Sequence, residues 1–355
     1  MLLCTICSSP VTARPDGRPP VNPLARRALD AWYGDAVPPL WARLLEPVYR
    51  GIVRLRRSAY RRGWRASGHP GRPVIVIGNL TAGGAGKTPL VAWLVRALQA
   101  RGLRPAVISR GYGGAEPLSP HEILVGDDAA FSGDEPLLLA SLTDCPVWIC
   151  RDRLAAARAA VDAGADIIVA DDGLQHYRLE RDFELLVIDA ERGLGNGRCL
   201  PAGPLREPAG RLQEVDFIVC NGAGSHCPGR GLRMDLVGTE AVRLDGQQRK
   251  PLEHFRAEPV HAVAGIGHPE RFFRFLEERG LEVIRHPLPD HGQIPAALLT
   301  PADGRAVLMT SKDAMRCMRQ PAAAGTWQVP VEARLEQDGA PLLDRLAQRL
   351  GIGEA

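Results

Sequence analysis

The stretch from Val74 to Pro89 constrains the fold of this chain more than any other part of the sequence. It opens with the short β-branched run Val74–Ile77, which is typical of a buried strand in a parallel sheet. Glycines follow the run, and Gly86-Lys87-Thr88-Pro89 indicates the start of a helix. A glycine-rich turn between strand and helix lets backbone N–H groups close on phosphate oxygens, and the helix N-terminus adds about half a positive charge. The stretch therefore predicts a nucleotide-binding phosphate loop.

In such a loop the lysine reaches the β- and γ-phosphates and the following threonine hydroxyl ligates Mg²⁺. The usual pattern is G-x-x-x-x-G-K-[ST], and Thr81 stands here where the first glycine belongs. The adjacent Gly83-Gly84 pair could supply the missing backbone freedom. We predict a catalytic role for Lys87, and we predict these nucleotide-binding residues: Thr81, Gly83, Gly84, Ala85, Gly86, Lys87 and Thr88.

The composition is that of a globular protein with room for two domains, since 45% of the 355 residues are hydrophobic and 24% are charged. The net charge of +3 is too small to indicate a nucleic-acid partner, and we expect none. The eight cysteines lack the spacing of a complete zinc site, so we expect reduced, mostly buried thiols. Met1–Cys7 is apolar but short and without a basic leader, and no apolar run reaches the roughly 18 residues of a spanning helix. We therefore expect neither a signal peptide nor a membrane-crossing segment.

The N-terminal part divides into two segments. Residues 1–30 include a stretch rich in Pro, Arg and Gly without periodicity, which predicts a flexible tail. Residues 31–66 are predicted to form a basic amphipathic helix, with Trp41, Leu45, Val48, Ile52 and Leu55 on one face and Arg43, Arg50, Arg54, Arg57 and Arg61 on another. Such a helix suits the surface of an anionic membrane. It equally suits docking of the apolar stripe on its own domain, and the sequence does not decide between the two.

Strands and helices alternate after the phosphate loop. Apolar runs predict strands at 106–108, 146–149, 167–169, 185–188 and 217–219, with helices at 90–100 and 153–163. The alternation predicts a phosphate-loop NTPase-like domain over residues 67–225, with a parallel sheet covered on both faces. A second, smaller α/β domain is predicted over residues 226–355, with strands at 261–264, 281–284 and 306–309 and helices at 269–279 and 341–350. The predicted fold class is α/β, with the functional site between the domains.

Two acidic motifs are candidates for chemistry. One apolar strand ends in Asp171-Asp172-Gly173, and ligands of open α/β sheets bind at the carboxyl ends of strands. Either aspartate could hold Mg²⁺ together with Thr88, and the alternative is a structural turn. Asp134 stands at a predicted helix start. It could cap that helix or act as a general base toward an acceptor hydroxyl, and helix-start rules alone favour the cap.

Weaker candidates follow other predicted strands. His291, after Asp290, could tune a base, although a surface histidine is the usual occupant of such a position. Gln175 and His176 follow the aspartate pair after two intervening residues, and Arg110 opens a glycine-rich loop. Arg206 ends a proline-stiffened loop, where it could bind an anion. We predict all four as substrate contacts.

Taken together, these stretches resemble one family, the tetraacyldisaccharide 4'-kinases of lipid A biosynthesis. The resemblance extends from the Trp41 helix to Lys312. It is carried by the following motifs, in one order: Gly78-Asn79-Leu80-Thr81, Gly83-Gly84-Ala85-Gly86-Lys87-Thr88-Pro89, Ser109-Arg110-Gly111-Tyr112-Gly113, Gly133-Asp134-Glu135-Pro136, Asp171-Asp172-Gly173-Leu174-Gln175-His176, Pro201-Ala202-Gly203-Pro204-Leu205-Arg206-Glu207, Pro289-Asp290-His291 and Met309-Thr310-Ser311-Lys312-Asp313.

The resemblance implies an ATP- and Mg²⁺-dependent kinase that phosphorylates the 4'-hydroxyl of a membrane-embedded tetraacyldisaccharide 1-phosphate. It implies work on the anionic inner membrane at its cytoplasmic face. We infer no obligate protein partner. The resemblance also implies that Asp134 is the catalytic base and that His291 is its supporting partner. Two positions depart from the family pattern, because Ile294 stands where an aromatic residue is usual and Ser311 where an acidic one is.

Two other classes of protein share part of this pattern. A nucleotide-dependent switch or metal-delivery ATPase would use the same phosphate loop and acidic strand end, but it needs neither a basic amphipathic helix nor a base. A soluble small-sugar kinase would lack the membrane helix. Dependence of activity on detergent or lipid discriminates among the three.

Overall fold

The computed structural model describes residues 23–111, 113–124, 127–290, 292–318, 320 and 325–352. The chain divides into two compact units. Among the described residues, the phosphate-loop unit comprises Leu44–Gly238 and residues 330–352, and the second unit comprises Thr239–Val329 and residues 23–43. Each unit has its own sheet and its own hydrophobic core.

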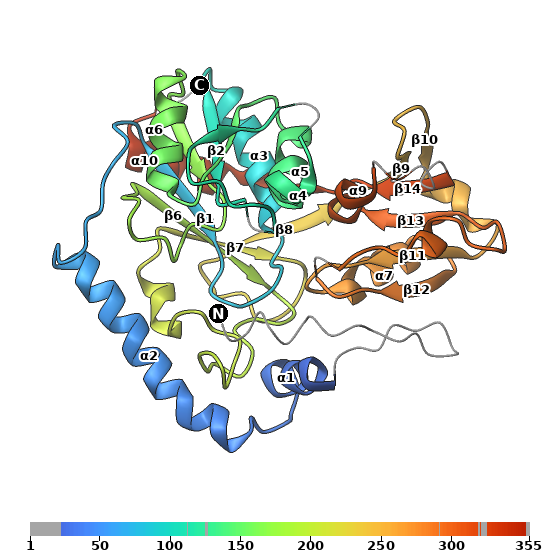
Figure 1. The fold of residues 1–355 in the computed structure, drawn as a ribbon, viewed down its shortest axis with the longest axis horizontal. Helices are drawn as coiled ribbons and strands as arrows, with labels where there is room; N and C mark the ends of the chain where they lie inside the picture. The colour runs from blue at the N-terminus through green and yellow to red at the C-terminus, as the bar shows by residue number, and fades with distance from the viewer. Residues whose placement is uncertain are drawn as a thin grey trace. The chain divides into compact units, whose positions relative to one another are not determined.

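The phosphate-loop unit is built on a sheet that has nine strands within the described ranges (Figure 1). Their spatial order is β15-β8-β7-β6-β1-β5-β2-β4-β3. Neighbours from β8 to β4 are parallel, and the edge pairs β15–β8 and β3–β4 are antiparallel. The strands are β1 (Val74–Gly78), β2 (Pro105–Ser109), β3 (His121–Glu122), β4 (Val147–Ile149), β5 (Ile167–Ala170), β6 (Phe183–Asp189), β7 (Phe217–Asn221), β8 (Leu232–Val237) and β15 (Glu332–Leu335). The predicted parallel sheet is confirmed, and the phosphate loop follows its central strand.

Side chains of β1 alternate between two hydrophobic cores, one on each face of this sheet. Ile75 and Ile77 pack on the face covered by α3 (Lys87–Gln99), α5 (Asp134–Leu142) and α10 (Ala340–Leu350). Val74 and Val76 pack on the other face, with α6 (Arg153–Asp162) and a segment that ends in the short helix η2 (Ala209–Gln213). The short helices α4 (Ala129–Ser132) and η5 (Glu336–Gly339) precede α5 and α10. All four β1 side chains are fully buried, which accounts for the β-branched run in the sequence.

The second unit has a sheet of six described strands in the order β10-β9-β14-β13-β11-β12. The strands from β14 to β12 are parallel, and β9 is antiparallel to both of its neighbours. Phe273 and Leu308 are fully buried members of its core. Its strands are β9 (Glu240–Arg243), β10 (Arg249–Pro251), β11 (Val260–Ala264), β12 (Val283–Pro287), β13 (Val307–Thr310) and β14 (Thr326–Val329), and its helices are α1 (Pro23–Tyr33), η3 (Leu252–Arg256), α7 (Pro269–Glu277), α8 (Ala296–Leu299) and α9 (Ser311–Cys317).

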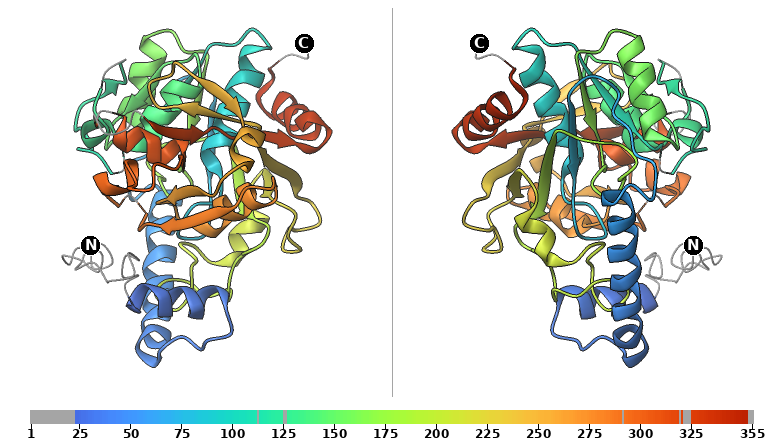
Figure 2. Two further views of the ribbon diagram at one scale, coloured as in Figure 1. Left: turned by 90° about the vertical axis from the view of Figure 1, so that its right-hand side faces the viewer. Right: turned by 90° about the vertical axis from the view of Figure 1, so that its left-hand side faces the viewer.

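Helix α2 (Leu40–Arg61) runs as one long helix through Pro47 (Figure 2). Its apolar side chains face solvent, with exposed fractions of 50–67% for Leu40, Trp41, Leu44, Leu45, Val48, Ile52 and Leu55. The face that packs on the phosphate-loop unit carries polar groups instead, since Glu46 is 5% exposed and Tyr49 and Arg57 are half-buried. Docking of the apolar stripe on its own domain is therefore wrong for the described residues.

The chain ends differ from the sequence prediction. Helix α1 begins at Pro23, inside the predicted tail, and residues 1–22 lie outside the described residues. The predicted helix over residues 31–66 comprises the end of α1 and all of α2, separated by a break at residues 34–39 that contains Pro38 and Pro39. The helix predicted at 341–350 is present, but it packs in the phosphate-loop unit because its Leu342 and Leu346 belong to the core of that unit.

Two further expectations concern cysteines and membrane spans. Cys220 and Cys227 form a disulfide, contrary to the expectation of reduced thiols. Cys150, Cys199 and Cys317 are free and buried, as expected. Among the described helices, none is both long enough and apolar enough to cross a membrane.

Candidate active site

The phosphate loop joins β1 to α3, and its backbone is open toward a ligand. Gly83 and Gly86 have φ values of 108° and 85°, which glycine adopts without strain. Gly86 has no room for a side chain, because a Cβ there would lie 2.0 Å from Nδ2 of Asn221. Within the described part of the chain, the N–H groups of residues 83–86 have no hydrogen-bond partner. They are therefore available to phosphate oxygens, as the sequence predicts.

Thr81, which replaces the usual first glycine, lies in a backbone segment that pairs with residues 204–206. It pairs with Leu205 in an isolated antiparallel bridge. On either side of it, Arg206 N–H donates to the Leu80 carbonyl at 2.7 Å and Ala82 N–H donates to the Pro204 carbonyl at 2.8 Å. The start of the loop is thus fixed by strand-like pairing, a conformation that a non-glycine residue adopts readily.

Lys87, the first residue of α3, lies between two polar side chains. Its Nζ is 3.2 Å from Oδ1 of Asn79 and 3.3 Å from Oδ1 of Asp172. Nη1 of Arg206 lies 3.0 Å and 3.2 Å from the two carboxylate oxygens of the same Asp172. Thr88 is the next residue of the helix. The structure therefore brings together Lys87, Asp172 and Arg206, which the sequence places in three separate motifs.

The two aspartates after β5 have different surroundings. Asp171 is 1% exposed, and its Oδ1 has no hydrogen-bond partner among the described residues. Burial raises the pKa of Asp171 to about 7, and the nearby Glu135 carboxylate adds to the rise. Burial also acts on Asp172, but Lys87, Arg206 and Arg153 outweigh it and hold the pKa of Asp172 below its ordinary value. An unpartnered buried carboxylate oxygen beside an ionised carboxylate is a donor set that fits a divalent cation.

Asp134 and Glu135 form the first turn of α5. Asp134 is 3% exposed, and its Oδ1 accepts a hydrogen bond from the Glu135 N–H at 3.0 Å. This contact agrees with the cap interpretation, because a carboxylate stabilises the free N–H groups of a helix N-terminus. The contact is also compatible with the base interpretation. The turn that carries Asp134 lies near the aspartate pair, since the charge of the neighbouring Glu135 raises the pKa of Asp171.

The predicted substrate contacts are not all at the loop. Gln175 is, since its Nε2 donates to the Asn79 carbonyl at 3.3 Å. His176 is half-buried, and burial together with Arg153 and Arg181 lowers its pKa to about 3, so its ring is neutral near pH 7. Arg110 is exposed and pairs with Glu116 at 3.1 Å. His291 lies outside the described residues.

Three residues of the site are not identified by the sequence pattern. Asn79 and Glu135 lie within motifs that carry the family resemblance, and that position is the signal that could have found them. Arg153 gives no such signal, because an arginine at the start of an alanine-rich helix resembles a solvated one. The structure buries it to 5% exposure, with Nη1 donating to the Asp172 carbonyl at 2.6 Å.

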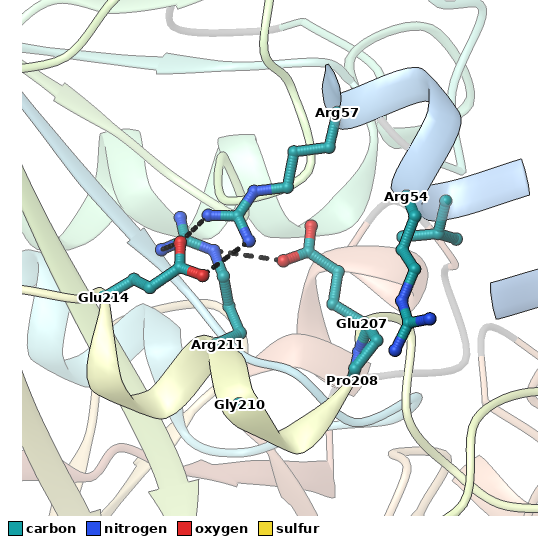
Figure 3. A pocket seen from close by; sticks show the side chains of 8 residues that line it. Arg54, Arg57, Glu207, Pro208, Gly210, Arg211 and Glu214 are labelled. Atoms are coloured by element: carbon teal, nitrogen blue, oxygen red, sulfur yellow. Dashed lines mark hydrogen bonds and ion pairs between the residues drawn. The ribbon is translucent and has the colours of Figure 1, made fainter. Parts of the chain in front are cut away.

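A pocket of about 170 Å³ lies where α2 meets η2 (Figure 3). Arg57 and Arg61 of α2 both bind Glu214, with Nη1 of Arg57 at 2.9 Å and Nη2 of Arg61 at 2.9 Å from its carboxylate oxygens. Nε of Arg211 binds Glu207 at 3.1 Å. The two ion pairs with Glu214 dock α2 on its own unit, and they involve two of the arginines that the sequence assigns to the basic face. The pocket lining comprises Val53, Arg54, Arg57, Glu207, Pro208, Gly210, Arg211 and Glu214.

Comparison with known proteins decides the family. The LpxK family model, described as tetraacyldisaccharide-1-P 4'-kinase, matches residues 40–350. This chain belongs to that family. A tetraacyldisaccharide 4'-kinase of Alkalilimnicola ehrlichii is 48% identical over 317 residues, which cover 88% of this chain and 95% of the relative. One of Pseudomonas aeruginosa is 46% identical over 311 residues, which cover 87% of this chain and 93% of the relative.

A solved structure supports the same assignment. LpxK from Aquifex aeolicus, in complex with ATP, matches with a TM-score of 0.70 and 25% sequence identity, covering 86% of this chain and 97% of that one. The resemblance drawn from the motifs and the α/β fold class are thus confirmed. The chain is a lipid kinase that acts on a lipid A precursor.

Proposed function

We propose that this kinase uses ATP and Mg²⁺ to phosphorylate the 4'-hydroxyl of a membrane-embedded tetraacyldisaccharide 1-phosphate. We place α2 on the anionic surface of the inner membrane, at its cytoplasmic face. The observation that carries the reaction is the position of Lys87, whose Nζ lies 3.3 Å from Asp172 at the helix end that follows the free N–H groups of the loop. The ATP-bound relative from Aquifex aeolicus supports ATP as the donor.

The phosphate loop binds the phosphates of ATP through two kinds of donor. The free N–H groups of residues 83–86 and the first N–H groups of α3 donate to phosphate oxygens. Lys87 Nζ binds the transferring phosphoryl group, where negative charge accumulates as the reaction proceeds. Because phosphoryl transfer needs little covalent work from the protein, this positioning carries much of the rate.

Thr88, Asp171 and Asp172 would hold Mg²⁺. The fit is supported by the orphaned Oδ1 of Asp171 and by the ionised carboxylate of Asp172. Bound Mg²⁺ supplies neutralisation of charge on the phosphates. Asp171 has to lose its proton to act as a ligand, so binding would release a proton below about pH 7.

Asp134 is the proposed base, supported by His291. Asp134 accepts the proton of the 4'-hydroxyl while that oxygen bonds to the γ-phosphorus and the bond from the γ-phosphorus to the ADP oxygen breaks. Arg110 stays a proposed substrate contact, because it is exposed and its ion pair with Glu116 leaves the guanidinium accessible to solvent. Gln175 and Arg206 also stay proposed substrate contacts, and they are held near the loop by the Asn79 carbonyl and the Asp172 carboxylate.

The inverted orientation of α2 supports the membrane role. A helix in a water-soluble protein ordinarily buries its apolar stripe, whereas α2 buries Glu46 and exposes Trp41, Leu44 and Ile52. Exposed apolar side chains can enter the boundary between headgroups and acyl chains, and adjacent arginines attract anionic lipid. This arrangement presents the kinase to an acceptor that does not leave the bilayer.

The test is transfer of labelled γ-phosphate from ATP to a purified tetraacylated disaccharide 1-phosphate in detergent micelles. We expect transfer by the wild type and its loss in Lys87→Ala. Asp134→Asn should lower kcat by roughly 10²- to 10⁴-fold, the usual contribution of a general base, with ATP affinity nearly unchanged. Loss of ATP binding in Asp134→Asn would reject the base assignment, and ATP hydrolysis without phosphorylated lipid would favour a nucleotide-dependent switch.

A further inference from the structure

Helix α2 holds one segment of the phosphate-loop unit at two points. At the first point, the buried carboxylate of Glu46 accepts from Cys199 N–H at 3.1 Å and from Nη1 of Arg198 at 2.9 Å. At the second, the Tyr49 hydroxyl donates to the Arg206 carbonyl at 3.0 Å. Glu46 and Tyr49 are three residues apart and share the docked face of the helix. The segment 198–206 is therefore fixed to α2 at both of its ends.

The same segment is paired with the phosphate loop on its other side. Arg206 N–H donates to the Leu80 carbonyl at 2.7 Å, and Thr81 pairs with Leu205. The Arg206 guanidinium binds Asp172, whose Oδ1 is 3.3 Å from Nζ of Lys87. Arg206 is thus held at three places, by Tyr49 at its carbonyl, by Leu80 at its N–H and by Asp172 at its side chain.

We propose that Tyr49 is a positioning residue for phosphoryl transfer, acting through Arg206. Its hydroxyl fixes the peptide that follows Arg206, and this contact orients the Arg206 guanidinium toward Asp172 and the Arg206 N–H toward the Leu80 carbonyl. The position of α2 therefore affects the geometry of Lys87 and Asp172 through Tyr49 and Arg206. In this way the membrane helix also helps to position the groups that bind the transferring phosphate. This inference rests on the proposed function of α2 as the membrane-facing helix.

A conservative variant isolates the contact. Tyr49→Phe removes the hydroxyl and keeps the ring that packs against the core of the unit. We expect kcat for lipid phosphorylation to fall roughly three- to tenfold, the range that one hydrogen bond of ordinary strength controls. Binding to anionic vesicles should stay at the wild-type level, because Tyr49 lies on the docked face of α2. Tyr60→Phe is the matched control, since the Tyr60 ring packs at a tilt against Tyr177, with 5.9 Å between ring centroids, and its hydroxyl has no hydrogen-bond partner within the described residues.

A double-mutant cycle tests whether the effect passes through Arg206. Arg206→Gln should lower kcat by itself, and Tyr49→Phe added to Arg206→Gln should lower it no further. A merely structural role of Tyr49 would instead give additive losses. Additivity, or a Tyr49→Phe loss no larger than that of Tyr60→Phe, would overturn the proposal, as would a loss explained by weaker vesicle binding. If the wild type transfers no phosphate to the lipid, the proposed function fails, which is a different outcome from failure of the cycle.

Discussion

Asp171 and Asp172 show at the scale of single residues how their neighbours set their charge. The two side chains are chemically identical and adjacent, yet burial raises the pKa of Asp171 to about 7, whereas Lys87 and Arg206 hold the pKa of Asp172 low. The sequence predicts both as metal ligands because they follow an apolar strand. It cannot predict their charge states, because the groups that set them come from positions 87, 135, 153 and 206.

His176 offers a pH test of the same principle. Burial and two arginines lower its pKa from 6.5 to about 3 in the folded chain, so between these values the unfolded chain binds a proton that the folded chain does not. Folding stability is therefore lost as pH falls through 6.5 toward 3. Between pH 7.5 and pH 5 this residue should remove about 2 kcal/mol from the free energy of unfolding.

Replacing the imidazole removes this dependence. Urea denaturation of wild type and His176→Gln at the two pH values should give a smaller loss of stability for the variant. The comparison uses the difference between the two pH values within each protein, so a constant effect of the substitution cancels. Equal losses in both proteins would show that His176 is protonated as easily when folded as when unfolded.

Helix α2 shows what periodicity predicts at the scale of one element. The spacing of its apolar residues predicts an amphipathic helix, and the helix is present. Spacing cannot tell which face is buried, because that depends on what the rest of the fold offers. Here Glu214, the residue after η2, pairs with Arg57, and the carboxylate of Glu46 on α2 accepts from Cys199 and Arg198. The polar face therefore docks and the apolar face stays exposed.

The exposed apolar residues and the individual arginines of α2 should contribute differently to vesicle binding. We expect the combination of Leu44→Gln, Val48→Gln and Ile52→Gln to weaken sedimentation with anionic vesicles at least tenfold, because each substitution loses apolar contact with the bilayer. Arg54→Gln should weaken it by roughly fivefold, equivalent to about 1 kcal/mol per basic residue near the surface. Arg57→Gln should affect stability more than vesicle binding, since Arg57 is paired with Glu214.

Each outcome bears on a separate point. Wild-type binding by the triple variant would reject the membrane role of the apolar face. A larger loss of vesicle binding from Arg57→Gln than from Arg54→Gln would show that the ion pair with Glu214 opens at the membrane surface.

At the scale of the whole molecule, the alternation of strands and helices predicts the parallel sheet, and the order β6-β1-β5-β2 is built from strands that the sequence indicates. The edges of the sheet are less predictable. Strand β15 and helix α10 return from the far end of the chain, and their sequences carry amphipathic patterns that suit either unit. Only packing decides, because Leu342 and Leu346 fill the face of the sheet that α3 also covers.

This return makes residues 330–352 part of the phosphate-loop unit, and one core substitution tests that claim. Leu346 is fully buried in the core that contains Leu90 and Ile75, so Leu346→Ala should cost about 2–5 kcal/mol of stability. Leu44→Ala, at a leucine that is 66% exposed, is the matched control and should change stability by less than about 0.5 kcal/mol in solution.

Hydrogen exchange locates the effect, because destabilising one cooperative unit speeds exchange throughout that unit. Peptides from β1 and α3 should exchange faster in Leu346→Ala, whereas peptides from β11 in the second unit should exchange as in the wild type. Faster exchange confined to β11 would instead place the C-terminal helix in the second unit, as the sequence suggests.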